Sequence, residues 1–221
     1  MRRLELNDNT QYSCLASAIA ILGAGGTVVV PTDTVYGLAG HVKSPKAIAA
    51  IFAIKGRPTN SPLPILVNSI EEIEKVAFVP EDRVKKFLDR AWPGKITCVL
   101  PARGWLPKEI LGVPKFGLEA KPRGLTVGVR VPKFHFLNKL LEAFKEPLSG
   151  TSANVSGHGP YTKIDDLIND FEKLPMRPDL IIDAGDLPNS KPSTLIDATV
   201  WPPEILREGA VSKRELESLF Y

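Results

Sequence analysis

The 221-residue sequence has few cysteines, few histidines and no long apolar run. The two cysteines, Cys14 and Cys98, are too few and too far apart for a disulfide framework or a cysteine-rich zinc site. The three histidines, His41, His135 and His158, show no metal-ligand spacing. No apolar stretch reaches the roughly 20 residues of a transmembrane helix, and the polar start does not resemble a signal peptide. We therefore expect a cytoplasmic protein with no membrane segment and no metal held by its own side chains.

Common nucleotide-binding and hydrolytic motifs are also absent. The chain has no G-x-x-x-x-G-K-[ST] phosphate loop and no G-x-G-x-x-G turn after a predicted strand. It has no G-x-S-x-G elbow, which argues against a histidine-assisted serine hydrolase. The formal net charge of +3 and the pI of about 8.8 permit a phosphate-bearing ligand or RNA without requiring either. A nucleotide would have to be held in another way.

What is present is typical of a globular protein, with 43% hydrophobic and 24% charged residues. Short apolar strands interleave with helical stretches, and Pro and Gly stand at their boundaries. The predicted strands span residues 27–31, 64–67, 95–102, 125–132 and 147–150, and we expect two further strand-like segments, 180–185 and 193–209, to pair. No repeat or linker divides the chain. The sequence predicts one α/β domain, residues 1–221, with a mixed sheet flanked by helices.

Three predicted helices carry start signals. The helix over residues 44–55 begins with Ser44 as N-cap and Pro45 at the first helical position. Two more begin with a hydroxyl and a carboxylate three residues apart, the spacing of a capping box. These pairs are Thr162 with Asp165 and Ser212 with Glu215.

The segment PTDTVYGLAG follows a buried strand and is rich in oxygen-bearing side chains. Thr32, Asp33 and Thr34 could offer oxygens to an ammonium or hydroxyl group of a ligand. The alternative interpretation is an ordinary turn in which these side chains cap backbone amides.

Two cations flank a glycine in the segment KGRP, where the helix over residues 44–55 ends. On a continuous helix Lys55 and Arg57 would diverge by roughly 200°. Because Gly56 relaxes the backbone and Pro58 prevents continuation, both can point at one anion. The alternative interpretation is a solvated helix end, at which cations complement the helix dipole.

Two later segments add polar groups at strand ends. Arg130 closes the apolar strand LTVGVRVP, and a cation there must reach solvent, an acidic partner or an anionic ligand. The segment LSGTSANVSGHGP is rich in small residues whose backbone amides could approach a phosphate or carboxylate closely. A flexible loop is the alternative, although the strand-like PLSG before it favours an ordered turn.

Taken in order, seven segments resemble the YrdC-like threonylcarbamoyl-AMP synthases, in their short, single-domain form. The segments are PTDTVYGL, KGRPTNSPL, WPGKITCVL, TVGVRVP, GTSANVSG, STLID and ILREG, between about residues 26 and 209. The resemblance implies a twisted mixed sheet with a basic concave cavity. It implies a nucleotidyltransferase that condenses L-threonine, bicarbonate and ATP into threonylcarbamoyl-AMP, releasing pyrophosphate. A tRNA threonylcarbamoyltransferase would then modify adenosine in tRNAs that read ANN codons.

Carried over position by position, the resemblance implies roles for eleven residues. Those implied for catalysis are Lys55 and Arg57. Those implied for ATP are Arg57, Asn60, Thr126, Ser152, Asn154 and Arg207. Those implied for threonine are Thr34, Lys55, Arg130, Gly150 and Ser193. One departure is Leu66, which stands in the strand where some longer members have a histidine.

The residue chemistry suits this reaction. A neutral threonine amine would take up carbon dioxide or bicarbonate, and the resulting carboxylate would attack the α-phosphate. Cations lining one cavity would stabilise these anionic species and align them. We expect Mg²⁺ to be held mainly by phosphates and water, because no acidic ligand pair stands out. No base for the ammonium group is identified.

Two other functions stay open at this point. A non-catalytic module that binds tRNA or double-stranded RNA could use the same basic concavity, with steep salt dependence. The hydroxyl and Ser-x-Asn positions are superfluous for that role, and the scattered aromatics give no stacking platform. A related carbamoyl-adenylate chemistry occurs in hydrogenase-maturation carbamoyltransferases, but those are long chains with zinc-finger-like cysteines, which this chain lacks.

Overall fold

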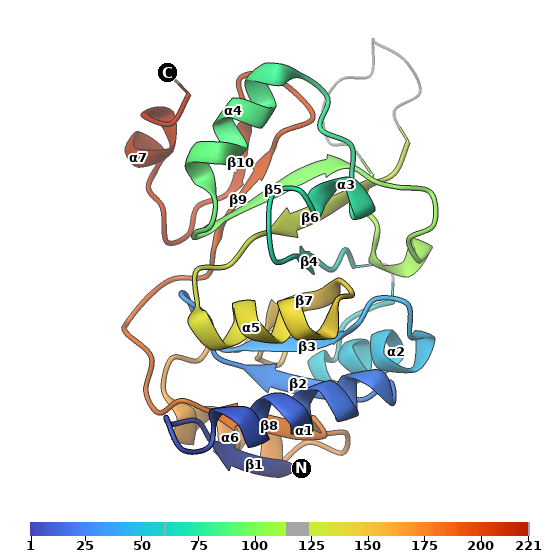
Figure 1. Ribbon diagram of the computed structural model, residues 1–221, viewed down its shortest axis with the longest axis vertical. Coiled ribbons are helices and arrows are strands. Elements are labelled where there is room, and N and C mark those ends of the chain that lie inside the picture. The colour runs from blue at the N-terminus through green and yellow to red at the C-terminus, as the bar shows by residue number, and fades with distance from the viewer. Residues whose placement is uncertain (60, 114–123, 221) are drawn as a thin grey trace.

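One ten-stranded sheet runs through the part of the chain that the computed structural model describes, residues 1–59, 61–113 and 124–220 (Figure 1). Its strands are β1 (Arg2–Glu5), β2 (Thr27–Val30), β3 (Gly37–His41), β4 (Ile65–Leu66), β5 (Ile96–Pro101), β6 (Thr126–Arg130), β7 (Leu148–Ser152), β8 (Leu180–Asp183), β9 (Thr194–Asp197) and β10 (Glu204–Arg207). They lie in the order β1-β8-β2-β3-β7-β4-β6-β5-β9-β10. Four neighbouring pairs are parallel and five antiparallel. The predicted mixed sheet is confirmed.

Helices flank this sheet on both faces. They are α1 (Gln11–Gly23), α2 (Pro45–Lys55), α3 (Ile73–Val76), α4 (Asp82–Ala91), α5 (His135–Phe144), α6 (Ile164–Glu172) and α7 (Lys213–Glu217), with a 3-10 turn, η1 (Lys108–Ile110). Helices α1 and α5 lie side by side on one face of the sheet (Figure 1). A second apolar cluster contains the buried residues of α3, α4, α6 and α7 and the large buried apolar residues of α2.

The alternation of side chains along the strands separates these two cores. On β2, Val28 and Val30 pack with α1 and α5, whereas Val29 points into the other cluster. On β6, Val127 and Val129 belong to that second core. The opposite face of β5, β6 and β9 contributes no residue to the α1–α5 cluster. This part of the sheet is therefore available to line a cavity.

Two of the three helix starts form as predicted. Helix α2 has Pro45 at its first position, and the Ser44 hydroxyl accepts a hydrogen bond from Ala47 N at 3.2 Å. It ends at Gly56, whose φ of 59° lies in the left-handed region that glycine adopts without strain. Ser212 and Glu215 form the complete capping box of α7.

The capping box predicted for Thr162 and Asp165 is wrong. Helix α6 begins at Ile164, after Lys163, and no side chain from this segment caps it. Instead Asp186, 22 residues away, accepts the hydrogen bond from Ile164 N at 3.1 Å. A carboxylate that is distant in sequence, and not the side chain of Thr162, therefore satisfies a free N–H group at the start of α6.

The expected pairing between segments 180–185 and 193–209 is also wrong. Strand β8 lies between β1 and β2, whereas β9 lies between β5 and β10. Within the second segment β9 and β10 do pair, as an antiparallel hairpin. The reason is that β8 adds in parallel to β2 and so belongs to the opposite end of the sheet.

Candidate functional site

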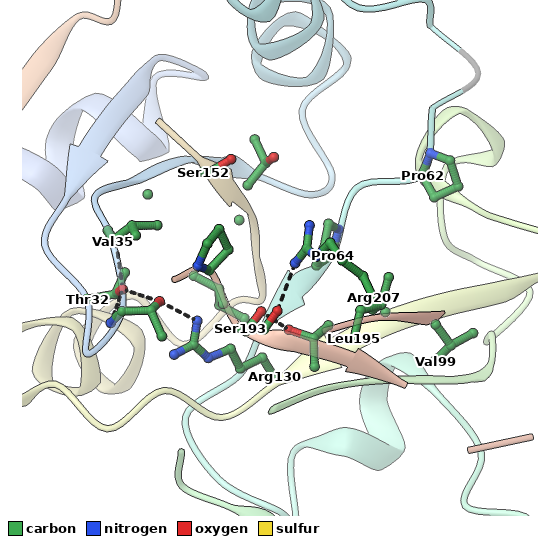
Figure 2. Close-up of a pocket in the computed structure, with 18 of the residues that line it drawn as sticks. Thr32, Val35, Pro62, Pro64, Val99, Arg130, Ser152, Ser193, Leu195 and Arg207 are labelled. Atoms are coloured by element: carbon green, nitrogen blue, oxygen red, sulfur yellow. Dashed lines mark hydrogen bonds between the residues drawn. The ribbon is translucent and has the colours of Figure 1, made fainter. Parts of the chain in front are cut away.

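A cavity of about 400 Å³ is lined in part by the alternate residues of β5, β6 and β9 that stay outside the two apolar clusters (Figure 2). Its volume is within the range of small-molecule sites. Eight of the eleven predicted site residues line it: Thr34, Arg57, Thr126, Arg130, Gly150, Ser152, Ser193 and Arg207. Lys55 and Asn154 lie outside the lining, and Asn60 falls outside the described residues. The structure thus brings together side chains up to 173 residues apart, from Thr34 to Arg207.

Arg130 enters the cavity from the end of β6 and is held from three directions. Its Nε donates to Gly94 O at 2.9 Å, Nη1 to Thr34 Oγ1 at 3.0 Å, and Nη2 to Asp33 Oδ1 at 2.6 Å. A guanidinium has five N–H donors. Among the described residues, these bonds leave two donors without a partner, one on each terminal nitrogen. Burial lowers the pKa of Arg130, while the charge of Asp33 acts to raise it.

The hydroxyl of Thr34 has a defined direction. Thr32 Oγ1 donates its one hydrogen to Val35 O at 2.7 Å, so it can only accept from its neighbours. Thr34 Oγ1, 3.0 Å away, must therefore donate to Thr32 while it accepts from Arg130. What the Thr34 hydroxyl still offers the cavity is one acceptor lone pair.

Two more arginines line the same cavity, Arg57 from the loop after α2 and Arg207 from β10. Burial lowers the pKa of Arg207, and the charge of Arg57 lowers it further. Two guanidinium groups that repel each other in this way favour an anion between them. Arg207 is held at its guanidinium group, because the terminal nitrogen Nη2 donates to Ser193 O at 2.9 Å (Figure 2).

Ser193 also joins two strands of the cavity wall. Its hydroxyl lies 2.7 Å from Thr97 Oγ1 in a buried hydrogen bond. Thr97 lines the cavity from β5, beside Val99, and Asp197 lines it from β9. Asp197 Oδ1 accepts from both Thr199 N and Thr199 Oγ1, at 2.9 and 2.6 Å, which turns that oxygen toward its own loop.

Lys55 is fully buried beside the cavity. Its Nζ donates to Ser152 O at 2.5 Å, Asn154 O at 2.9 Å and Asn154 Oδ1 at 3.3 Å. Burial, and to a lesser extent Arg57, lower the pKa of Lys55 to about 7. Three acceptor oxygens nevertheless match the three donors of the charged ammonium, whereas a neutral amine would leave one oxygen unpaired. Lys55 therefore holds the main chain of a cavity residue, and Arg57 alone of this pair faces the cavity.

Asn154 ties the loop after β7 together. Its Nδ2 donates to Val155 O at 3.0 Å and to His158 O at 2.6 Å, while its oxygens accept from Lys55. With its side chain used in this way, Asn154 fixes the loop that follows Ser152. The Ser152 side chain itself lines the cavity (Figure 2).

Gly150 is required by a close approach. A Cβ at this position would lie only 2.5 Å from Leu66 Cγ. Leu66 in turn pairs in register with Arg130 across the parallel strands β4 and β6, and both line the cavity. Leu66, with the predicted Gly150, thus forms an apolar wall next to the guanidinium.

Sequence reasoning did not select Thr97 or Asp197 as site residues. A signal was available, because each is a polar residue at an alternate position of an otherwise apolar strand. Such a residue is either a satisfied core group or part of a site, and only the neighbouring strands distinguish the two. Among the described residues, no group of three or more histidine, cysteine or acidic side chains could hold a metal ion. No helix in this part of the chain is long and apolar enough to cross a membrane.

A family model named Sua5_yciO_yrdC, described as "Telomere recombination", matches residues 20–209. The chain belongs to the Sua5/YciO/YrdC family. The predicted resemblance is confirmed at the level of the family.

Individual members of the Sua5/YciO/YrdC family align with nearly the whole chain. The threonylcarbamoyl-AMP synthase of Pyrococcus abyssi is 35% identical over 202 residues, which are 91% of this chain and 56% of that relative. The chain therefore spans little more than half the length of that relative.

Two solved structures share the fold. P. abyssi Sua5 in complex with L-threonine has a TM-score of 0.84 at 32% identity, covering 99% of this chain and 60% of that one. Escherichia coli YciO has a TM-score of 0.81 at 26% identity, covering 97% and 98% of the two chains. The architecture described above is thus that of the family, including a member of similar length.

Proposed function

We propose that this protein is an L-threonylcarbamoyladenylate synthase, a nucleotidyltransferase that condenses L-threonine, bicarbonate and ATP into threonylcarbamoyl-AMP and pyrophosphate. The observation that carries the proposal is that two groups of polar side chains line one cavity. Arg130 and Thr34, which are hydrogen-bonded to each other, suit an amino acid, and Arg57 and Arg207 suit phosphates. The name of the Pyrococcus relative, and the threonine complex of Sua5, support the choice of substrates.

For the amino acid, the two remaining N–H donors of Arg130 suit a carboxylate, which accepts on both oxygens. The acceptor lone pair of Thr34 suits a donor, either the amine or the hydroxyl of threonine. Gly150 and Ser193 would also contact the amino acid, and the Ser193 carbonyl holds Arg207 beside it. A site that hydrogen-bonds the substrate hydroxyl would discriminate against apolar isosteres of threonine.

For the nucleotide, Arg57 and Arg207 would flank the phosphates, with Ser152 and Thr126 beside them. Our assignment of Asn60 to the nucleotide stays a prediction. We assign Lys55 and Asn154 to holding the main chain around Ser152, because their polar atoms are occupied there. The earlier assignment of Lys55 to catalysis and threonine binding stays untested.

The proposed reaction balances without a covalent enzyme intermediate. The threonine nitrogen forms a bond to the carbon of bicarbonate, and water leaves to give an N-carboxylate. An oxygen of this carboxylate then bonds to the α-phosphorus of ATP while the α,β-bridging P–O bond breaks and pyrophosphate leaves. Arg57 and Arg207 would stabilise the charge that develops on the phosphates. A preorganised donor of this kind is typically worth about 3–4 kcal/mol of barrier.

Magnesium would enter with the nucleotide. The described residues form no carboxylate cage for it, and Asp197 has one oxygen occupied by Thr199. This donor set does not fit a resident ion. Magnesium bound mainly by phosphates and water is compatible with such a cavity.

The product would need an acceptor elsewhere. A mixed carboxylic–phosphoric anhydride is an activated acyl donor, and we propose that a tRNA threonylcarbamoyltransferase consumes it to make N6-threonylcarbamoyladenosine in ANN-reading tRNAs. That placement makes the cytoplasm the expected compartment. Direct binding of tRNA or double-stranded RNA by this chain would be additional to the synthesis.

The test is pyrophosphate release from ATP and bicarbonate, measured with and without L-threonine. We expect release that needs both, and a new threonine-containing adenylate by mass spectrometry. Arg57→Ala and Arg130→Ala should abolish it, whereas Arg177→Ala, an exposed arginine outside the cavity lining, should not. A folded protein without threonine-dependent release would contradict the proposal. Salt-sensitive RNA binding in its place would favour the RNA-binding module.

A further inference from the structure

Asp33 and Arg130 form a buried ion pair at the edge of the cavity. Their closest atoms are 2.6 Å apart, and the side chains are 9% and 8% exposed. A buried pair of this kind adds little net stability, because the cost of removing both charges from water offsets their attraction. Stability alone therefore does not explain why the pair is found at this position.

The position of the carboxylate relative to the cavity is informative. Thr32 and Thr34, on either side of Asp33, line the cavity together with Arg130, but Asp33 does not. The carboxylate thus contacts a guanidinium that lines the cavity, without lining the cavity itself. It can act on a ligand through Arg130.

The ion pair completes a three-point attachment of the guanidinium. Gly94 O fixes Nε, Thr34 Oγ1 fixes Nη1, and Asp33 Oδ1 fixes Nη2. Asp33 is the sole anion among these acceptors and makes the shortest of the three bonds. With all three nitrogens held, the plane of the guanidinium is set before any ligand arrives.

The second oxygen of Asp33 is unusual. Oδ2 is buried and has no hydrogen-bond partner among the described residues. Buried polar atoms are nearly always paired, and an unpaired one in a native fold needs an explanation, often a functional one. The carboxylate is thus paired through one oxygen, Oδ1, and that oxygen contacts Arg130.

We propose that Asp33 is a positioning residue that orients Arg130, so that its two remaining N–H donors meet the carboxylate of the amino-acid substrate. The amino acid as ligand rests on the proposed function above. Preorganisation of this kind lowers the entropic cost of binding. Because the hydrogen bond and ion pair of Asp33 go to Arg130, and not to the two arginines proposed for the phosphates, loss of Asp33 should affect the amino acid and spare ATP.

The experiment compares Asp33→Ala and Asp33→Asn with the wild-type protein. We expect Asp33→Ala to raise the KM for L-threonine about 10- to 100-fold, because Arg130 loses the group that orients it, with the KM for ATP nearly unchanged. Asp33→Asn should recover part of this loss, because its amide oxygen can accept the same hydrogen bond. The matched control is Glu146→Gln, which removes the carboxylate of the exposed pair with Lys43.

A second readout does not depend on turnover. In ¹⁵N NMR spectra, the Arg130 Nη atoms of the wild-type protein should give separate signals, since the group cannot rotate, and these should merge in Asp33→Ala. An Arg130→Lys variant assigns the signals. If wild-type protein shows no threonine-dependent turnover, the proposed function fails, and these spectra still decide whether Asp33 orients Arg130.

Three results would overturn the inference. One is an unchanged threonine KM with unchanged Arg130 signals in Asp33→Ala. Another is a proportionate rise of both KM values with a lower Tm, which would indicate a general structural role. A third is a lower threonine KM in Asp33→Asn, which would show that the carboxylate mainly repels the substrate.

Discussion

At the scale of single residues, Lys55 and Arg57 show how two neighbouring cations take different tasks. Gly56 turns the chain between them, so Lys55 points into the protein and Arg57 into the cavity. A buried lysine is tolerated because three oxygens surround its ammonium. This single side chain bonds the main chain at both Ser152 and Asn154.

The first prediction follows from that contact. Lys55→Ala should lower the free energy of unfolding by about 3 kcal/mol, because three buried oxygens lose their donor. Arg57→Ala should change it by less than about 1 kcal/mol, since Arg57 is half-buried and its side chain bonds Ser156 Oγ alone among the described residues. Urea unfolding followed by circular dichroism, beside pyrophosphate release, measures both.

Lys55→Met is the matched control, since it keeps most of the side-chain volume and removes the donors. If the lost hydrogen bonds contribute more than the lost packing, Lys55→Met should lower the free energy of unfolding nearly as much as Lys55→Ala. A Lys55→Ala protein of wild-type stability but without activity would instead place Lys55 at the reacting groups.

At the scale of elements, strand alternation makes the same strands serve core and cavity. On β6, Val127 and Val129 enter the core, while Thr126, Gly128 and Arg130 line the cavity. Strands β5 and β9 do the same with their own alternate residues. A one-residue slip in register would therefore exchange the core and the site together.

The turn between β2 and β3 is also attached to another element, through Tyr36. Its hydroxyl donates to Gly185 O at 2.6 Å and accepts from Ala184 N at 3.0 Å, just after β8. Tyr36 is fully buried, and burial raises its pKa to about 12, partly opposed by the Ala184 N–H. The phenol thus fixes the segment that carries Thr32 and Thr34.

The second prediction uses this pKa. Between pH 10 and 12 the unfolded chain has lost the Tyr36 proton and the folded protein keeps it, so stability falls as the pH rises through this window. Two pKa units correspond to about 3 kcal/mol. Tyr36→Phe, which cannot ionise, should be less stable than wild type at pH 8 and close to it near pH 12. Urea unfolding of both proteins across this pH range measures how the difference between their free energies of unfolding decreases.

Because all other groups titrate in both proteins, their contributions cancel in the comparison. A difference between wild type and Tyr36→Phe that stays constant from pH 8 to 12 would contradict the raised pKa.

At the scale of the whole molecule, the cavity joins distant parts of one sheet. Its walls come from β2 and β3 near one end and from β9 and β10 at the other end. A ligand that fills both ends of the cavity links these parts, and binding to the folded state alone stabilises the whole domain.

The third prediction concerns this linkage. ATP at about 100 times its Kd should add about 2.7 kcal/mol of stability and raise the Tm by about 5–10 °C, in a single transition. L-Threonine should give a further rise. Arg207→Ala should lose the shift caused by ATP, whereas Arg130→Ala should lose the shift caused by threonine. Differential scanning calorimetry records both. Two separate transitions, only one of which responds to ligand, would contradict a single cooperative unit.

Local sequence determined those features that depend on neighbouring residues. Ser44, Pro45 and Gly56 mark the ends of α2, and Ser212 with Glu215 begins α7, as predicted. The ordered motifs placed eight residues that do line one cavity. The glycine-rich β3 and the short polar β1 escaped prediction, because neither has the apolar pattern of an independent strand.

Tertiary structure decided the features that depend on residues far apart in sequence. Asp186 begins α6 in place of Thr162, β8 pairs with β2 and not with β9, and Asp33 meets Arg130 across 97 residues. Which alternate residues of a strand face a core and which face a cavity depends on where helices cover the sheet. Packing against distant segments settles that, because burial, and not local propensity, supplies most of the free energy.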